Sequence, residues 1–162
     1  MSSSSIEFRD GMYHLSGRID ETMNLDQLRD ATAFPIKLNF HRVTSINSVG
    51  ARNMIALIQT LGEAEIEFHE CPPHFILTLD MLPRMRGHPE RVKSCYLPHV
   101  CPSCTASVDV LIEMREVRYK SSKISVPRKA CESCQSVLRP DVDLNEFFLF
   151  LIETQSSTST NS

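Results

Sequence analysis

The chain has 162 residues, of which 41% are hydrophobic and 23% charged, and its net charge is −3, as is typical of soluble globular proteins. The longest apolar run is far shorter than the roughly 20 residues of a membrane-spanning helix, and the polar MSSSS start does not fit a signal peptide. We therefore expect a cytoplasmic protein, in which the six cysteines indicate metal ligands or free thiols rather than disulfides.

The N-terminal part of the chain predicts a hairpin, a helix and a buried strand. A strand from Ile6 and a strand at Met12–Ser16 flank Asp10-Gly11, a dipeptide typical of tight hairpin turns. A first helix is expected at about Leu25–Ala31. The next strand has the alternation that indicates one buried face, with hydrophobic residues at Ile36, Leu38 and Phe40.

A tight turn and an amphipathic helix follow this strand. The turn carries Asn47, Ser48, Val49 and Gly50, and apolar residues then return at helical spacing, at Ala51, Met54, Ile55, Ile58 and Leu61. Asn47 and Ser48 are both good capping residues, so one interpretation of Ser48 is that it only caps the helix. The other is a phosphorylation site, because an added phosphate would meet unpaired N–H groups and the positive end of the helix dipole.

The alternation of strands and helices continues. Ile66–Phe68 is expected to form a strand, and Cys71–Pro83 a helix with two prolines in its first turn. A last strand, Val92–Leu97, is expected to complete the sheet. Together these elements predict an α/β fold with a mostly parallel or mixed sheet covered by helices.

Four of these segments, taken in order, resemble a STAS domain, the fold of anti-sigma-factor antagonists and of sulfate-transporter cytoplasmic tails. The resemblance rests on Ile36–Leu61, on HLSGRIDETMNLDQL at His14–Leu28, on Ile66–Phe68 and on Cys71–Pro83. It implies a STAS-like mixed sheet flanked by helices. It also implies a non-catalytic module of a bacterial signalling circuit that binds a kinase or an anti-sigma factor.

The turn of the STAS family reads Asp-Ser-Ser/Thr-Gly, and its first Ser is the residue that a partner kinase phosphorylates. The resemblance therefore implies phosphorylation or partner binding at Ser48, with Asn47, Val49 and Gly50 in the same contact surface. In this chain Asn47 stands where the family has Asp, and Val49 replaces the second hydroxyl residue. The alternative is a constitutive docking surface that is never phosphorylated.

Two CxxC pairs predict a metal site in the C-terminal part. Cys101-Pro-Ser-Cys104 and Cys131-Glu-Ser-Cys134 are separated by 26 residues, and four thiolates in two such knuckles make a closed tetrahedral Zn²⁺ site. The strand pattern between the pairs indicates a zinc ribbon, with enough chain for an extra hairpin arm. An iron–sulfur cluster or a redox CxxC are the alternatives. Cys71 and Cys95 are expected to be free core thiols.

The charge changes sign shortly before this module is expected to begin, which supports a domain boundary near Pro83–Pro98. Residues 1–83 carry six basic and eleven acidic side chains, residues 84–129 ten basic and four acidic, and residues 130–162 one basic and five acidic. We predict a STAS-like domain over residues 6–98 and the zinc ribbon with a C-terminal helix over residues 99–153.

The Ser/Thr-rich tails, residues 1–5 and 154–162, are expected to be disordered. The helix, Asp143–Glu153, is apolar nearly all round, so it is expected to be buried on the ribbon or to form a dimer face.

The sequence shows no catalytic triad, paired-carboxylate signature or Gly-rich phosphate loop, so we predict a non-enzyme that binds a protein partner. One alternative is a nucleic-acid-associated regulator that uses six basic residues of the ribbon: Arg115, Arg118, Lys120, Lys123, Arg128 and Lys129. The others are a STAS subunit of a transport complex and a redox enzyme.

Overall fold

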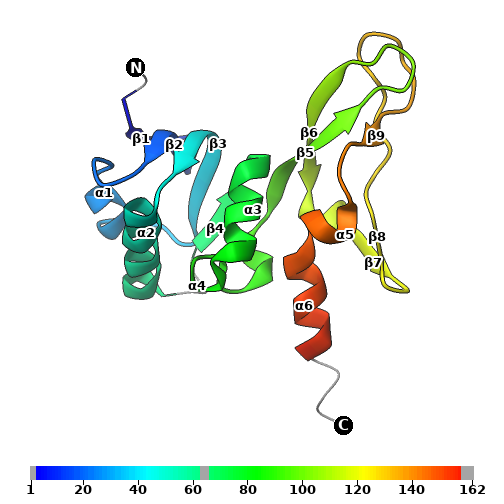
Figure 1. Cartoon of the computed structure of the whole chain (residues 1–162). Helices are drawn as coiled ribbons and strands as arrows, with labels where there is room; N and C mark the ends of the chain where they lie inside the picture. The colour runs from blue at the N-terminus through cyan, green and yellow to red at the C-terminus, as the bar shows by residue number, and fades with distance from the viewer. Residues whose placement is uncertain (1–2, 63–65, 158–162) are drawn as a thin grey trace.

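The computed structural model describes residues 3–62 and 66–157 and shows a mixed α/β fold (Figure 1). The first sheet has the strand order β1-β2-β3-β4. β1 and β2 form the expected antiparallel hairpin, whereas β3 runs parallel to both β2 and β4. The prediction of a mixed sheet is therefore confirmed. The strands are β1 (Ser5–Arg9), β2 (Met12–Ile19), β3 (Ile36–Ile46) and β4 (Ile66–His69).

Helices cover one face of this sheet (Figure 1). They are α1 (Asp26–Arg29), α2 (Ser48–Leu61), α3 (Pro73–Met81) and α4 (Pro83–Arg86). The alternating residues of β3 are buried beneath them, as predicted, because this strand lies in the middle of the sheet. The ring of Phe40 stacks on Phe75 of α3 at a centroid distance of 4.1 Å and meets Phe68 of β4 edge-on at 5.1 Å.

The strand expected at Val92–Leu97 lies mainly in a second sheet, but it also bonds to the end of the first sheet, so the prediction that it completes the first sheet is confirmed in part. After the short helix η2 (Pro89–Arg91), β5 (Ser94–Val100) pairs with β6 (Ser107–Glu113) on one side and with β9 (Arg139–Pro140) on the other. The parallel bridges Phe68–Val92 and Cys71–Cys95 join it to the end of the first sheet. Three backbone hydrogen bonds accompany these bridges, from the N–H of Lys93 to Phe68, of Cys71 to Ser94 and of Tyr96 to Cys71. The ladder between the two bridges is interrupted at Glu70, which follows the end of β4 and takes a left-handed φ of 51°.

The long spacer between the CxxC pairs forms an additional arm. β6 is followed by a short helix, η3 (Met114–Glu116), and by a two-stranded hairpin of β7 (Arg118–Lys120) and β8 (Lys123–Ser125). The side chain of Asn145 ties the arm down, accepting from the N–H of Ile124 and donating to the carbonyl of Ser122. The arm is therefore attached to the C-terminal segment.

The C-terminal segment forms two helices where one was predicted, α5 (Leu144–Phe147) and α6 (Leu149–Ser157). Asp143 caps α5 by accepting hydrogen bonds from the N–H groups of Asn145 and Glu146. The break falls at Phe148, whose ψ of 37° is not helical. Its ring is fully buried together with Phe150, so packing places the break where sequence periodicity shows none.

The described part of the chain includes some residues of both tails that the sequence predicts to be disordered. α6 extends to Ser157 and so includes residues 154–157, which lie in the predicted C-terminal tail. At the other end Ser5 belongs to β1, and the Ser4 hydroxyl donates to the carbonyl of Arg18 at 2.7 Å. Residues 1–2 and 158–162 lie outside the described part of the chain. Within the described part, no helix is long and apolar enough to cross a membrane.

A buried ionic cluster joins the C-terminal helix to the helices on the first sheet. Nη1 of Arg86 lies 3.9 Å from Oδ1 of Asp80 in α3 and 3.5 Å from Oε2 of Glu153 in α6. The side chains of Asp80 and Arg86 are only 11% and 10% exposed. Burial raises the pKa of the Asp80 carboxyl from 3.8 to about 6, although the nearby Arg86 acts to lower it.

We expect this cluster to make the protein less stable as the pH rises from about 4 to about 6. The folded chain keeps a proton on Asp80 (pKa about 6) that the unfolded chain, with an ordinary pKa of 3.8, has already released. The free energy of unfolding should therefore fall through this window, by on the order of 2 kcal/mol. Urea denaturation across this range should show the fall, and Asp80→Asn should remove it. If the free energy of unfolding changes with pH in the same way in the natural protein and in Asp80→Asn, the prediction is wrong.

Candidate functional site

The two CxxC pairs form the same turn twice. In the first, the N–H of Cys101 donates to the carbonyl of Ala106 and the N–H of Thr105 to the carbonyl of Cys101, both at 2.9 Å. In the second, Cys131 donates to Ser136 and Gln135 to Cys131, both at 2.8 Å. Thr105 and Gln135 take nearly the same left-handed φ, 61° and 63°. Two equivalent knuckles therefore face each other.

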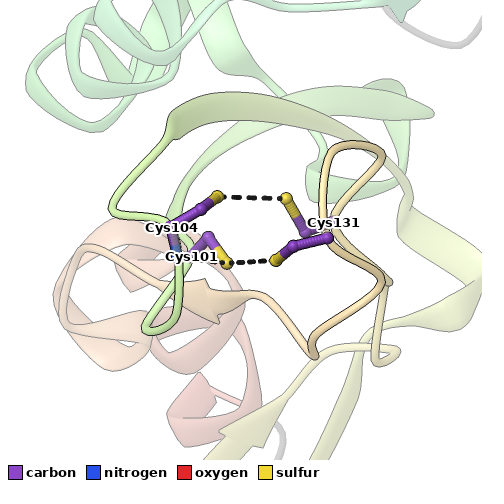
Figure 2. Close-up of side chains that lie close together, drawn as sticks. Cys101, Cys104 and Cys131 are labelled. Atoms are coloured by element: carbon purple, nitrogen blue, oxygen red, sulfur yellow. Dashed lines mark hydrogen bonds between the residues drawn. The ribbon is translucent and has the colours of Figure 1, made fainter.

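The four sulfurs meet between these knuckles. The Sγ atoms of Cys101, Cys104, Cys131 and Cys134 all lie within 4.8 Å of one another. Sγ of Cys101 is 3.4 Å from that of Cys134, and Sγ of Cys104 is 3.7 Å from that of Cys131 (Figure 2). A tetrahedral ion with bonds of about 2.3 Å to sulfur places its ligands about 3.8 Å apart. The cluster fits a four-coordinate metal ion.

Local hydrogen bonds lower the pKa of two of these thiols, those of Cys131 and Cys134. The Ser136 hydroxyl and N–H donate to Cys134 and lower the pKa of its thiol to about 6. The N–H groups of Cys134 and Ser133 lower the pKa of Cys131. The N–H of Ala106 likewise acts to lower the pKa of Cys104, but its contacts with the sulfurs of Cys101 and Cys131 raise that pKa to about 11. All four sulfurs can be thiolates together only if a cation balances their charge.

The four-cysteine cluster is partly buried and lies near the protein surface, as a structural metal site can. Cys101 and Cys131 are buried with Leu138 in a small hydrophobic group separate from the main core. Cys104 and Cys134 face solvent. A hydrogen bond of 2.8 Å between the hydroxyls of Ser103 and Ser136 links the knuckles directly. Four protein ligands leave no coordination position open for a substrate.

The two remaining cysteines lie in the main core. Cys71 and Cys95 are fully buried free thiols and are paired in an isolated parallel bridge between the two sheets. Burial raises the pKa of Cys95 to about 12 and that of Cys71 well above its ordinary value. Both stay protonated at neutral pH, which fits their predicted role as core thiols.

The turn before α2 places Ser48 at an exposed helix start. Asn47 is the N-cap, and its Oδ1 accepts a hydrogen bond of 2.8 Å from the N–H of Gly50. Its Nδ2 donates to Oε2 of Glu21 at 2.9 Å, and this bond lowers the pKa of the Glu21 carboxyl. The contact explains why Asn suits position 47, because an Asp there would face another carboxylate. Sequence reasoning missed Glu21, which lies far from the turn along the chain.

Gly50 allows the turn to approach the end of β2. A Cβ atom at this position would lie 2.1 Å from the carbonyl oxygen of Ile19, so a larger residue requires the backbone to move. Gly50 is buried, whereas Ser48 is exposed and Val49 is 36% exposed. The turn thus presents its hydroxyl and one apolar side chain to solvent while its glycine anchors the helix to the sheet.

An apolar groove lies beside this turn, between α2 and the end of α3. It encloses about 550 Å³ and is lined from three segments of the chain: by Ile46, Asn47 and Ser48, by Ala51, Arg52 and Ile55, and by Thr78, Met81, Leu82 and Arg84. Met81 is 81% exposed although it is hydrophobic. The structure thus brings two of the predicted turn residues together with α3, which sequence reasoning had not assigned to the site. No protein-family model, curated protein or solved structure matches this chain.

Proposed function

We propose that this chain is a non-catalytic, STAS-like regulatory protein that binds a protein partner through the Asn47–Gly50 turn and helix α2. The observation that carries the proposal is the apolar groove, which has Ser48 at its rim and the exposed Met81 in its lining. Isolated exposed apolar side chains are common, but an apolar hollow of this size is typical of a binding site. A kinase or an anti-sigma factor is the partner that the STAS resemblance suggests.

A switch at Ser48 would act on this groove directly. The hydroxyl belongs to the first residue of α2, where unpaired N–H groups and the helix dipole favour an added negative charge. The groove also holds Arg52 and Arg84. A phosphate on Ser48 would change the charge at the rim and draw these guanidinium groups toward itself, so a partner that needs them would be released.

We propose that the four-cysteine cluster holds a structural Zn²⁺ in a zinc ribbon that serves as a second docking surface. Four sulfur ligands, paired knuckles and no open position support zinc in a structural role. The arm formed by β7 and β8 supports the alternative of nucleic-acid contact, because Arg118, Lys120 and Lys123 are exposed on it. Binding that weakens steeply with added salt would favour that alternative.

Ser48→Asp should weaken partner binding about tenfold or more if a charge at the rim is the switch, whereas Ser48→Ala should leave it nearly unchanged. Affinity purification from the native lysate with each form of the intact protein identifies the partner. Titration of the purified partner then gives the affinities. Equal affinity for all forms would leave Ser48 as a structural residue only.

A second pair of variants tests the groove itself. Met81→Lys places a charge in the lining and should release the partner, whereas Leu77→Lys on the same helix changes a residue that is also exposed, 53%, but lies outside the groove. A partner that both variants bind equally well does not use the groove. If all these variants recover a transport ATPase, or nucleic acid, as well as the natural chain does, the function belongs to another surface.

A further inference from the structure

We propose that the outer face of the first sheet carries a binding site for hydrogen phosphate. A cavity of about 180 Å³ opens there, lined by Leu15 and by four basic side chains, one amide and one carboxylate: Arg9, His14, His41, Arg42, Asn39 and Glu70. A cavity of this size has room for a small anion such as phosphate.

A bulge in β3 brings two of these basic side chains to the same face. The register between β2 and β3 shifts between the pairs His14–Asn39 and Ser16–Arg42, so β3 holds one extra residue at this point. His41 and Arg42 are consequently both exposed, although consecutive residues of a regular strand point to opposite faces. The N–H of His41 donates to Oδ1 of Asn39 at 2.9 Å, which stabilises the bulge.

The cavity lining offers donors that the rest of the protein does not use. Asn39 is only 4% exposed, and its oxygen is occupied at the bulge, so its amide hydrogens remain for a ligand. Within residues 3–62 and 66–157, the guanidinium groups of Arg9 and Arg42 have no ion-pair or hydrogen-bond partner. Guanidinium groups bind oxyanions through strong, paired hydrogen bonds. These side chains therefore form a site for a small oxyanion.

Glu70 determines which oxyanion fits. The residue follows β4 with a left-handed φ of 51°, and its N–H donates to the buried Ser94 hydroxyl at 2.8 Å, which fixes its position. Its Oε2 accepts from the Tyr96 hydroxyl at 3.3 Å and lies 4.0 Å from Nδ1 of His41. An ionised carboxylate only accepts hydrogen bonds, at about four sites, so the Glu70 carboxylate can accept from one more donor. Hydrogen phosphate brings such a donor, whereas sulfate at neutral pH has none.

Calorimetric titration of the intact, zinc-loaded protein with sodium phosphate and with sodium sulfate, at constant ionic strength and neutral pH, tests the proposal. Phosphate should bind about tenfold more tightly than sulfate, because sulfate would set an oxygen against the Glu70 carboxylate. Arg42→Gln should weaken phosphate binding about tenfold, the loss expected for one hydrogen bond to a charged group. Glu70→Gln should bring the two affinities to within about threefold, since an amide can donate to sulfate.

The matched control is Lys37→Gln, which removes a positive charge from the same strand and the same face but from a residue outside the cavity lining. It should leave phosphate binding unchanged, and circular dichroism should show that every variant is folded. Equal affinities for phosphate and sulfate in the natural chain would overturn the proposal. So would an Arg42→Gln protein that binds phosphate as well as the natural chain does, or a Lys37→Gln protein that binds it as weakly as Arg42→Gln.

Discussion

Replacing Cys131 with Ser should release the bound metal and unfold the two knuckles while the first sheet stays folded. Four thiolate ligands bind Zn²⁺ with on the order of 10 kcal/mol of free energy, and in small modules this binding energy is folding energy. Cys131 is 4% exposed, and its neighbours form a hydrophobic group too small to hold the knuckles without the ion. Chelation of the natural protein should therefore have the same effect as the substitution.

Elemental analysis of the purified proteins measures the bound metal, and hydrogen exchange measures the unfolding of the knuckles. The exchange of amides in residues 101–106 and 131–136 should become fast, while amides of β2 and β3 remain protected. Cys95→Ala is the control, because it removes a buried thiol of the main core and should leave one zinc per chain. Full metal content in Cys131→Ser would rule out a four-cysteine site. Loss of metal in Cys95→Ala as well would mean that metal is lost through destabilisation of the fold and not through removal of a ligand.

Patterns that depend on near neighbours in the sequence predicted much of this structure. The period-two run of β3, the Asp-Gly hairpin and the CxxC spacing each fix a local geometry, so the mixed sheet and the sulfur cluster follow from them. The sequence did not show that β5 lies mainly in a second sheet, because strand partners depend on distant segments. Its own sequence fits either sheet, and what pairs with it is β6, which also belongs to the loop between the knuckles.

The surface sites depended on contacts that no sequence pattern announces. The groove beside Ser48 forms because the end of α3 lies near α2. In the sequence, Met81 looks like any other residue of an apolar helix. The bulge at His41 breaks the alternation of β3 by a single residue, which is visible in the sequence only once the neighbouring strand and its register are known. Glu21 reaches Asn47 because β2 ends beside α2, through the close approach at Gly50.

Phe148→Ala should lower the stability of the whole chain by about 3–5 kcal/mol, the usual cost of truncating a fully buried Phe. The Phe148 ring lies between those of Phe147 and Phe150, at 4.9 and 6.3 Å, and all three belong to the one main core that also contains β2 and β3. The C-terminal helices should therefore stabilise the first sheet, although the sequence predicts that the first domain ends at residue 98.

Urea denaturation measures the loss of stability, and hydrogen exchange at the amides of Leu15 and Phe40 shows whether the first sheet shares that loss. Together the two measurements distinguish a shared core from two independent domains. If the core is shared, exchange at these two positions should accelerate in Phe148→Ala along with that of α5 and α6. Leu149→Ala removes the adjacent side chain, which is 43% exposed, and should cost less than about 1 kcal/mol. Unchanged protection of Leu15 and Phe40 in Phe148→Ala would mean that residues 6–98 fold alone. The shared core would then be a contact between two domains, and a partner that displaces α6 would leave the groove beside Ser48 intact.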